Sequence, residues 1–489
     1  MTTFLLAIAV LIGGYFVYGF FAEKIFGVEP DRQTPAVTMN DGVDFIIMPT
    51  WKVFLIQFLN IAGLGPVFGA IMGIMFGPAA FLWIVFGTIF AGAVHDFISA
   101  MISLRFKGNS LPEIVGHELG STVRNIMRVF SIVLLILVGV VFVLTPADLI
   151  AGMTPDWMDR MFWVALIFIY YIAATLLPID KLIGNLYPIF GFALLFMAVG
   201  ILGVLIYGAI TNTITIPDGL TDGLHSRFTG DAAASHPIFP MMFVSIACGA
   251  ISGFHATQSP MMARCLKNEK LARPVFYGAM VTEGFVALIW AAGAIAFVGG
   301  YDQMGEYMTT HQPGDLVHDL SFEWLGSFGG LLAMIGVIAA PISTGDTALR
   351  SARLIVADFM KVSQKKFLSR LAISLPIFAI VFALMFLDFN VLWRYFAWSN
   401  QTLAVFTLWA CTVYLGRKQK FYYITLLPAM FMTAVSISYL MFAPRPEGLG
   451  MDWYISVGSG VGVSLLFTIL FFYYLNRIKT GKSSRVFEY

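Results

Sequence analysis

The sequence predicts an all-α, polytopic membrane protein, and three observations support this fold class. Of its 489 residues, 59% are hydrophobic and only 12% are charged, with a mean hydropathy of +0.83. Such a composition needs lipid as its solvent and excludes a string of soluble domains. Apolar runs of about 20 residues, the length of helix that crosses a bilayer core, recur along the whole chain. The net charge of +1, without a long basic tract, argues against nucleic acid as a partner.

About thirteen apolar runs are long enough to be spanning helices. They cover approximately residues 3–23, 52–75, 78–104, 125–146, 160–178, 182–210, 237–264, 274–299, 324–348, 367–387, 391–416, 421–443 and 452–476. No hydrophilic stretch between them exceeds about 30 residues, so residues 1–489 are expected to form a single transmembrane domain. We expect an extra N-terminal helix at 1–23, a core at 52–416, two peripheral helices at 421–476 and a cytoplasmic tail at 477–489.

The basic residues predict the orientation. If the amino terminus lies outside, all but four of the 29 lysines and arginines fall on the inner side; the exceptions are Arg160, Arg227, Arg394 and Arg445. The positive-inside rule therefore places the amino terminus outside and the carboxyl terminus in the cytoplasm, in the inner membrane of a prokaryote. The first run has neither a basic n-region nor a small-residue cleavage site, so we expect it to be retained.

Two of the spans are interrupted. The second contains Gly63, Gly65 and Pro66 at mid-membrane, and the seventh contains the polar run from Gly249 to Pro260. Proline removes a backbone donor, and lipid cannot satisfy the carbonyl groups that it frees. Each interruption is therefore expected to line a cavity or to find protein partners; a plain proline kink is the alternative for either one.

The interrupted spans lie five spans apart and enter from opposite faces, as in an inverted repeat of five plus five helices of the LeuT or APC type, here spans 2–6 and 7–11. The amide groups that follow Pro66 favour an anionic substrate group such as a carboxylate. The predicted substrate-binding residues are Asn60, Gly63, Gly65, Ser252, Gly253, His255 and Gln258, with Asn400 and Gln401 of the eleventh span. For Asn400 and Gln401, hydrogen bonding between helices is the alternative.

A cluster of hydroxyl groups at the end of the ninth span is a candidate ion site. Ser343, Thr344 and Thr347, with carbonyl groups near Ile61 and Ala62, would form an oxygen cage for sodium. Asp346 would serve proton coupling, or pair with Arg350 or Arg353 on the same helix face. Packing of small residues between helices is the alternative for the hydroxyl groups.

Ionisable residues at membrane depth are functional candidates because burying charge there is costly. These are His95 and Asp96, which lie close enough to the interface to snorkel, together with Glu283 and Arg350. No phosphate loop, nucleophile elbow or metalloprotease motif occurs, and Cys248, Cys265 and Cys411 have no metal-ligand spacing. We therefore expect no enzyme, no metal and no cofactor other than a coupling proton or sodium ion.

Seven short blocks resemble the carbon starvation protein A (CstA) family of peptide and pyruvate transporters. They are Asp44-Phe45, Ile61-Ala62-Gly63-Leu64-Gly65-Pro66, Gly92-Ala93-Val94-His95-Asp96-Phe97, Ile251-Ser252-Gly253-Phe254-His255-Ala256, Tyr277-Gly278-Ala279-Met280, Asp346-Thr347-Ala348-Leu349-Arg350-Ser351-Ala352-Arg353 and Asn400-Gln401-Thr402-Leu403-Ala404. Together they span roughly residues 40 to 405 and coincide with the interruptions described above.

The resemblance implies a secondary carrier with the five-plus-five architecture that imports short peptides, or a small carboxylate such as pyruvate, during nutrient limitation. Longer members of the family carry a histidine pair where this chain has Gln57-Phe58, and a glutamine in place of His95. A channel remains an alternative, as does a membrane-embedded sensor or metal-dependent enzyme that would use His95, Asp96 and His255. Substrate and lipid are the expected partners, and the number of chains that assemble is left open.

Overall fold

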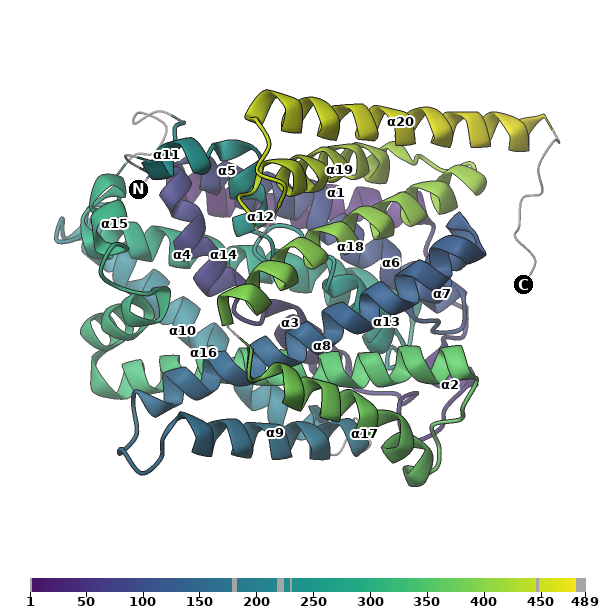
Figure 1. The fold of residues 1–489 in the computed structure, drawn as a ribbon, viewed down its shortest axis with the longest axis horizontal. Helices are drawn as coiled ribbons and strands as arrows, with labels where there is room; N and C mark the ends of the chain where they lie inside the picture. Colours follow the sequence, from purple (N-terminus) through teal and green to yellow (C-terminus); the bar gives the residue numbers. More distant parts are fainter. Residues whose placement is uncertain are drawn as a thin grey trace.

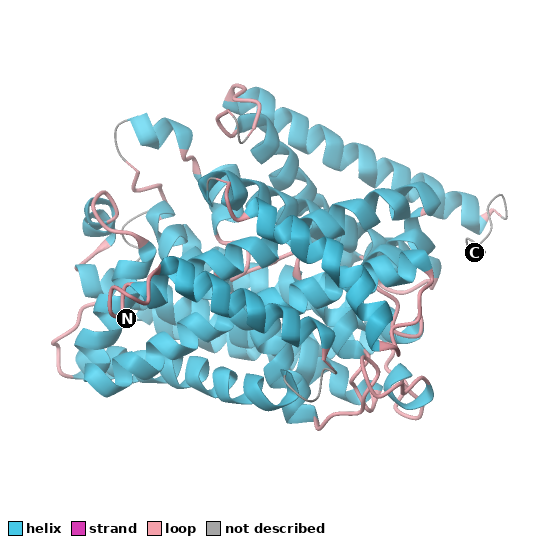
Figure 2. Cartoon of the chain, turned by 60° about the horizontal axis from the view of Figure 1, so that its bottom comes forward, coloured by secondary structure: helices cyan, strands magenta, loops and turns pink. Residues whose placement is uncertain are grey.

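The computed structural model describes residues 2–177, 183–217, 224–228, 231–387, 389–445 and 448–480. Within these ranges the chain consists of helices, turns and loops (Figure 2), and an isolated bridge between Gln33 and Asn268 is the only β-type pairing. The predicted all-α class is therefore confirmed. Most of the predicted tail, residues 481–489, lies outside the described ranges.

The α-helices follow the predicted order. They are α1 Thr2–Phe26, α2 Pro35–Thr38, α3 Thr50–Ala62, α4 Ala70–Gly73, α5 Ala79–Gly87, α6 Ala93–Arg105, α7 Leu111–Leu119, α8 Ser121–Ala151, α9 Arg160–Leu176, α10 Ile183–Ile210, α11 Asp231–Ser235, α12 Phe243–Ser245, α13 His255–Ala263, α14 Gly278–Val298, α15 Tyr301–Tyr307, α16 Pro313–Met360, α17 Phe367–Leu384, α18 Phe389–Arg417, α19 Tyr423–Phe442 and α20 Trp453–Lys479. Short π-helical turns at Gly65–Gly69, Thr88–Gly92, Ile238–Met242 and Arg273–Tyr277 precede α4, α6, α12 and α14.

Nine helices of the described chain are long and apolar enough to cross a membrane. A tenth span would be the pair Thr50–Ala62 and Gly65–Phe76, which is bent by 54° at the predicted interruption. Each predicted run coincides with a helix or an interrupted helix. The polytopic class is thus supported, whereas the count of thirteen spans and the five-plus-five repeat stay predictions.

The long helices run side by side between two ends of the bundle (Figure 1). Helix α1 begins at the end where α11 and α15 lie, and α20 ends at the opposite end, where α2 and α7 lie. An odd number of crossings, such as the predicted thirteen, produces this arrangement. Many large apolar side chains of α1 and α20 are exposed, for example Phe16, Val17 and Ile469, as expected of helices that face lipid.

Polar side chains gather in the middle of the bundle rather than on its surface. Helices α3, α6, α13, α14, α16 and α18 contribute many of the buried polar residues, and α3, α6 and α14 also carry the fully buried aromatic residues Phe58, Phe97 and Trp290. Because polar groups inside a membrane protein are costly unless they have a function or a partner, this centre is where a site is expected.

Candidate functional site

The first interruption lies between α3 and the turn that begins at Gly65. Helix α3 ends at Ala62, and Gly63 has φ of 49°, a left-handed conformation that favours glycine. A Cβ atom on Gly63 would lie 3.0 Å from the Phe142 ring and 3.4 Å from Oγ1 of Thr344. The chain therefore turns here in close contact with α8 and α16.

The second interruption separates α12, which ends at Ser245, from α13, which begins at His255. A Cβ atom on Gly65 would lie 1.8 Å from Cβ of Cys248, and one on Gly253 would lie 2.2 Å from the carbonyl oxygen of Asn400. Glycine is required at both positions because backbones approach too closely for a side chain. The two interruptions are thus in direct contact, from segments far apart in the sequence.

Asn400 holds the second interruption from α18. Its Oδ1 accepts hydrogen bonds from Oγ of Ser252 (2.9 Å) and from the backbone amide of Phe254 (2.7 Å). From the other side, Oγ1 of Thr88 donates to the carbonyl of Gly249 at 3.1 Å. Of the two interpretations of Asn400, the structure favours hydrogen bonding between helices over contact with substrate.

Replacing Asn400 with alanine is therefore expected to destabilise the protein. The change leaves the Ser252 hydroxyl and the Phe254 amide buried without this acceptor, and each such group costs about 1–3 kcal/mol. A thermal unfolding scan in detergent should show a lower midpoint than for Asn125→Ala, which alters an exposed asparagine. Equal midpoints for the two variants would show that Asn400 does not brace the interruption.

Four ionisable side chains from three helices form what we term the histidine–carboxylate cluster: His95, Asp96, His255 and Glu283. Nδ1 of His95 lies 2.8 Å from Oδ1 of Asp96, and Nδ1 of His255 lies 3.1 Å from Oδ2 of Asp96. Nε2 of His255 is 3.6 Å from Oε2 of Glu283. All four side chains are fully buried. From the sequence, His95, Asp96 and His255 were grouped only as the site of an alternative sensor or metal-dependent enzyme, and Glu283 was a separate candidate.

The cluster has unused hydrogen-bonding capacity. An ionised carboxylate only accepts, so we assign a proton to Nδ1 of both histidines. Both oxygens of Glu283 and the Nε2 atoms of His95 and His255 then have no hydrogen-bond partner among the described residues. Nε2 of His255 and the carboxyl group of Glu283 therefore face each other 3.6 Å apart without a hydrogen bond.

The structure corrects the expectation that His95 and Asp96 could snorkel to the interface. Both are buried, and Asp96 is directed to His255 on another helix. In the described part of the chain, no three His, Cys, Asp or Glu side chains have a geometry that could hold a metal ion.

The hydroxyl groups of the predicted sodium cage differ in their surroundings. Ser343 donates to the carbonyl of Ala340 (2.7 Å) and Thr347 to that of Ser343 (3.0 Å), both within α16. Thr344 lies 3.0 Å from the carbonyl of Ala340 in α16, and it also reaches the carbonyl of Leu59 at 2.9 Å, two residues before the expected Ile61. Thr344 therefore ties α16 to the end of α3, while Ser343 and Thr347 show the hydrogen bonding of a packed helix.

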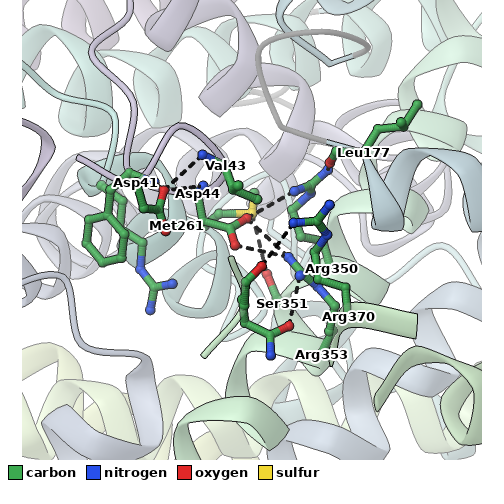
Figure 3. Close-up of polar contacts among 12 residues, drawn as sticks. Asp41, Val43, Asp44, Leu177, Met261, Arg350, Ser351, Arg353 and Arg370 are labelled. Atoms are coloured by element: carbon green, nitrogen blue, oxygen red, sulfur yellow. Dashed lines mark hydrogen bonds and ion pairs between the residues drawn. The ribbon is translucent and has the colours of Figure 1, made fainter. Parts of the chain in front are cut away.

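Asp346 contacts the hydroxyl group of Tyr187, which also lies 2.7 Å from the carbonyl of Ser343. Its Oδ2 has no hydrogen-bond partner among the described residues. The expected pairing of Asp346 with Arg350 or Arg353 is wrong, since both arginines pair with Asp44 (Figure 3). Tyr187 had no distinguishing signal, because it lies within a long apolar run.

Buried amide side chains next to the interruptions are only partly used. Asn60 and Gln401 make no side-chain hydrogen bond among the described residues, although both are buried. Gln57 and Gln258 each donate one hydrogen bond, to Ser259 and Thr257, and leave their oxygens unpartnered. Because buried polar groups in native proteins almost always have partners, these amides are candidates to bind a polar solute. Gln57 was absent from the predicted set.

A cavity of about 710 Å³ lies on one side of the interruptions. It is lined by Phe68 and Gly69, just after the first interruption, and by Ser245, just before the second. Its other walls come from the end of α8 and the beginning of α16, and include Asp148, Gln312 and Asp315. Its volume is in the range of small-molecule sites. We call it the outer cavity, because these helix ends are predicted to face outside.

Two interrupted helices that meet beside buried ionisable and amide side chains, within a bundle of apolar helices, define a polytopic membrane protein with a polar centre. The family described as carbon starvation protein CstA matches residues 1–157, 147–319 and 314–439. The chain belongs to this family, so the resemblance seen in the sequence is confirmed.

Relatives of two kinds are similar to this chain. An uncharacterized membrane protein of Haemophilus influenzae is 45% identical over 342 residues, 61% of this chain and 91% of that protein. The peptide transporter CstA of Campylobacter jejuni is 30% identical over 341 residues, 58% of this chain and 48% of that protein. That of Escherichia coli is 28% identical over 373 residues, 63% of this chain and 52% of that protein. The chain thus spans about half the length of the peptide transporters it matches.

Proposed function

We propose that this chain is a secondary transporter that imports a small solute bearing a carboxylate, either a short peptide or a monocarboxylate such as pyruvate, in response to carbon starvation. The observation that carries the proposal is the contact of two interrupted helices beside buried amides with unused hydrogen-bonding groups. Interrupted helices at mid-membrane are how many carriers bind solutes. The names of the longer relatives favour a peptide.

The coupling ion in this proposal is the proton. The histidine–carboxylate cluster is buried, and it adjoins the second interruption because its member His255 is the first residue of α13. Histidine changes charge near neutral pH, and a buried carboxylate next to it can share the proton. Sodium remains the alternative ion, with Thr344 and Asp346 as its ligands.

In the proposed cycle, solute reaches the interruptions from the outer cavity and binds among Asn60, Gln258 and Gln401. Proton uptake between His255 and Glu283 cancels the buried negative charge of Glu283, which lowers the cost of the rearrangement. The two halves, spans 2–6 and 7–11, then move relative to each other and open the opposite end. Gly63, Gly65 and Gly253 allow the close contacts at the two interruptions, and the hydrogen bonds of Asn400 hold the second interruption in place.

Counterflow distinguishes this carrier from a channel, a sensor or an enzyme. Proteoliposomes loaded with unlabelled dialanine or pyruvate are diluted into a trace of the same labelled solute, without any ion gradient. A carrier exchanges the two and transiently concentrates the label inside. If either solute enters without transient accumulation, the protein is a channel; if neither enters, these solutes are not its substrates and the carrier proposal loses its support.

A further inference from the structure

Asp44, in the segment that joins α2 to α3, contacts two buried arginines of α16 (Figure 3). Its Oδ1 accepts hydrogen bonds from Nη1 of Arg350 (3.0 Å) and Nη2 of Arg353 (3.1 Å), and its Oδ2 lies 3.2 Å from the same Nη2. The arginine side chains are fully buried, and that of Asp44 is 2% exposed. A single carboxylate thus binds two guanidinium groups, which we call the arginine pair.

The arginine pair is held in place by partners other than Asp44. Nη2 of Arg350 donates to the carbonyl of Leu177 (2.7 Å) and contacts that of Ala174, where α9 ends. Nη1 of Arg353 donates to Oε1 of Gln364 at 2.9 Å. Both side chains are therefore anchored on the side away from Asp44. Without Asp44 they would still present donors in the geometry that a carboxylate prefers.

Positive charge exceeds negative charge around this carboxylate. Arg264 and Arg370 are also buried nearby. The acids in this region include Asp41, whose Oδ1 accepts from the Asp44 amide, and Asp358, which lies 3.6 Å from Arg264. Burial alone would raise the pKa of Asp44, but the charges of Arg353, Arg350 and Arg264 outweigh it and hold that pKa below its usual value. Asp44 is therefore ionised at neutral pH. Its ion pairs stabilise the fold at any pH above the pKa that Asp44 has in the unfolded chain, and this stabilisation is lost as the pH falls through the lower pKa that it has in the folded protein.

The arginine pair lies on the far side of the interruptions from the outer cavity. Arg350 is one helical turn beyond Asp346 on α16, on the side away from Thr344 and its contact with α3. The neighbouring Ser351 lies 3.5 Å from the carbonyl of Thr257 on α13, the helix that leads away from the second interruption. The pair therefore sits between α16, the end of α9 and the Asp44 turn, toward the end of the bundle predicted to face the cytoplasm.

Asp44 belongs to a non-helical turn that keeps its own shape. Oδ1 of Asp41 accepts from the amides of Val43, Asp44 and Phe45 at 2.9–3.0 Å. Displacement of the turn would break no helix, but it would separate the Phe45 ring from the Arg264 guanidinium (4.9 Å) and the Met48 amide from the carbonyl of Cys265 (3.3 Å). Sγ of Cys265 lies 4.0 Å from the carbonyl oxygen of Asp44, so this buried thiol is covered while the turn is in place.

We propose that Arg350 and Arg353 form a carboxylate-binding site inward of the helix interruptions, which the chain's own Asp44 occupies in this state and a solute carboxylate occupies once the Asp44 turn swings away. The identity of the solute rests on the proposed function, whereas the affinity of the site for carboxylates does not. Asp44 thereby closes the inner end of the pathway while the outer cavity is open.

Chemical rescue tests the site without any transport assay. Purified Asp44→Ala is titrated with sodium acetate at neutral pH, with sodium chloride at equal ionic strength as the reference, and the thermal unfolding midpoint is followed. We expect a lowered midpoint that acetate raises saturably and chloride does not, because acetate replaces the missing carboxylate. Wild type, whose tethered Asp44 has a high effective concentration, should not respond. Asp358→Asn, which removes the carboxylate beside Arg264 instead, is the matched control and should not respond either. If acetate has no more effect than chloride, the proposal is wrong.

A second variant serves if Asp44→Ala does not fold. In Asp44→Asn the weakened contact should let the turn open, so N-ethylmaleimide should modify Cys265 about tenfold faster or more than in wild type. Cys411, buried in α18, is the internal reference. Acetate should slow the modification again; an unchanged rate, or a rate indifferent to acetate, contradicts the proposal. If acetate rescues the variant but the protein shows no counterflow, the proposed transport function is wrong and the carboxylate site is supported. If the protein shows counterflow but acetate gives no rescue, the transport function is supported and the carboxylate site is wrong.

Discussion

Replacing Glu283 with glutamine is expected to abolish proton-driven accumulation of solute while leaving counterflow intact. The carboxyl group of Glu283 is fully buried and faces Nε2 of His255 at 3.6 Å. An amide of the same size resembles the protonated acid but cannot release a proton. The variant should therefore rearrange as the loaded carrier does, and exchange solute, yet gain nothing from a pH gradient. With an inward proton gradient, the variant should let solute equilibrate but should no longer raise it above its external concentration.

The matched control for this variant is Glu323→Gln, which changes an exposed glutamate of α16 far from the cluster in sequence and should keep gradient-driven uptake. Full retention of proton-driven uptake by Glu283→Gln would exclude Glu283 as a proton site. Loss of both uptake and counterflow, together with a lowered unfolding midpoint, would show that the carboxyl group is structural.

Alanine at Gly65 is the substitution with the largest expected effect on the fold. Its Cβ atom would be placed 1.8 Å from Cβ of Cys248, far inside van der Waals contact, and 3.1 Å from the Cys248 Cα atom. The interruptions would have to move apart, and overpacking of this kind typically costs about 1–3 kcal/mol or more. We expect a lower unfolding midpoint and loss of counterflow.

A double-mutant cycle shows whether this effect arises between the two interruptions. Cys248→Gly removes the Cβ atom against which the new methyl group would clash, so it should restore part of the stability and exchange lost in Gly65→Ala. Gly203→Ala on α10, where a Cβ atom would meet nothing within 4 Å, is the control. Additive effects of the two substitutions would mean that Gly65 and Cys248 do not contact each other.

The positions of the interruptions could be predicted from sequence because their cause is local. Glycine and proline act on the backbone of their own turn. Gly63, Gly65 and Pro66 therefore predict the end of α3, and no knowledge of the packing between helices is needed. The same holds for the all-α class, which follows from the length and composition of the apolar runs.

The partners of the buried polar residues could not be predicted in the same way. Asp96 and His255 are 159 residues apart, and Asp44 and Arg350 are 306 apart, so only the packing of the bundle brings them together. The spacing of Asp346 and Arg350 on one helix face predicted an ion pair between them, but Arg350 pairs instead with Asp44, in a turn far away in the sequence. Arg350 and Arg353, three residues apart on α16, were the one available sign that a carboxylate such as Asp44 had to lie nearby.

The roles of the hydroxyl and amide side chains were the hardest to predict, because the same residue types occur in binding sites and in packed helices. Ser343 and Thr347 hydrogen-bond only within α16, whereas Thr344, between them, also bonds to α3. Asn400 and Gln401 are adjacent, yet the oxygen of Asn400 accepts two hydrogen bonds and Gln401 makes none among the described residues. These differences depend on which way each side chain points.

The most direct test of the proposed symport measures solute and proton movement together in proteoliposomes that contain a pH-sensitive dye. Labelled dialanine or pyruvate is added outside with an inward proton gradient, and in parallel with a sodium gradient or none. We expect the proton gradient to drive one solute above its external concentration, and addition of that solute to acidify the interior faster than leakage does. Equilibration of the solute to the same level under all three conditions, with no acidification, would contradict proton-coupled transport.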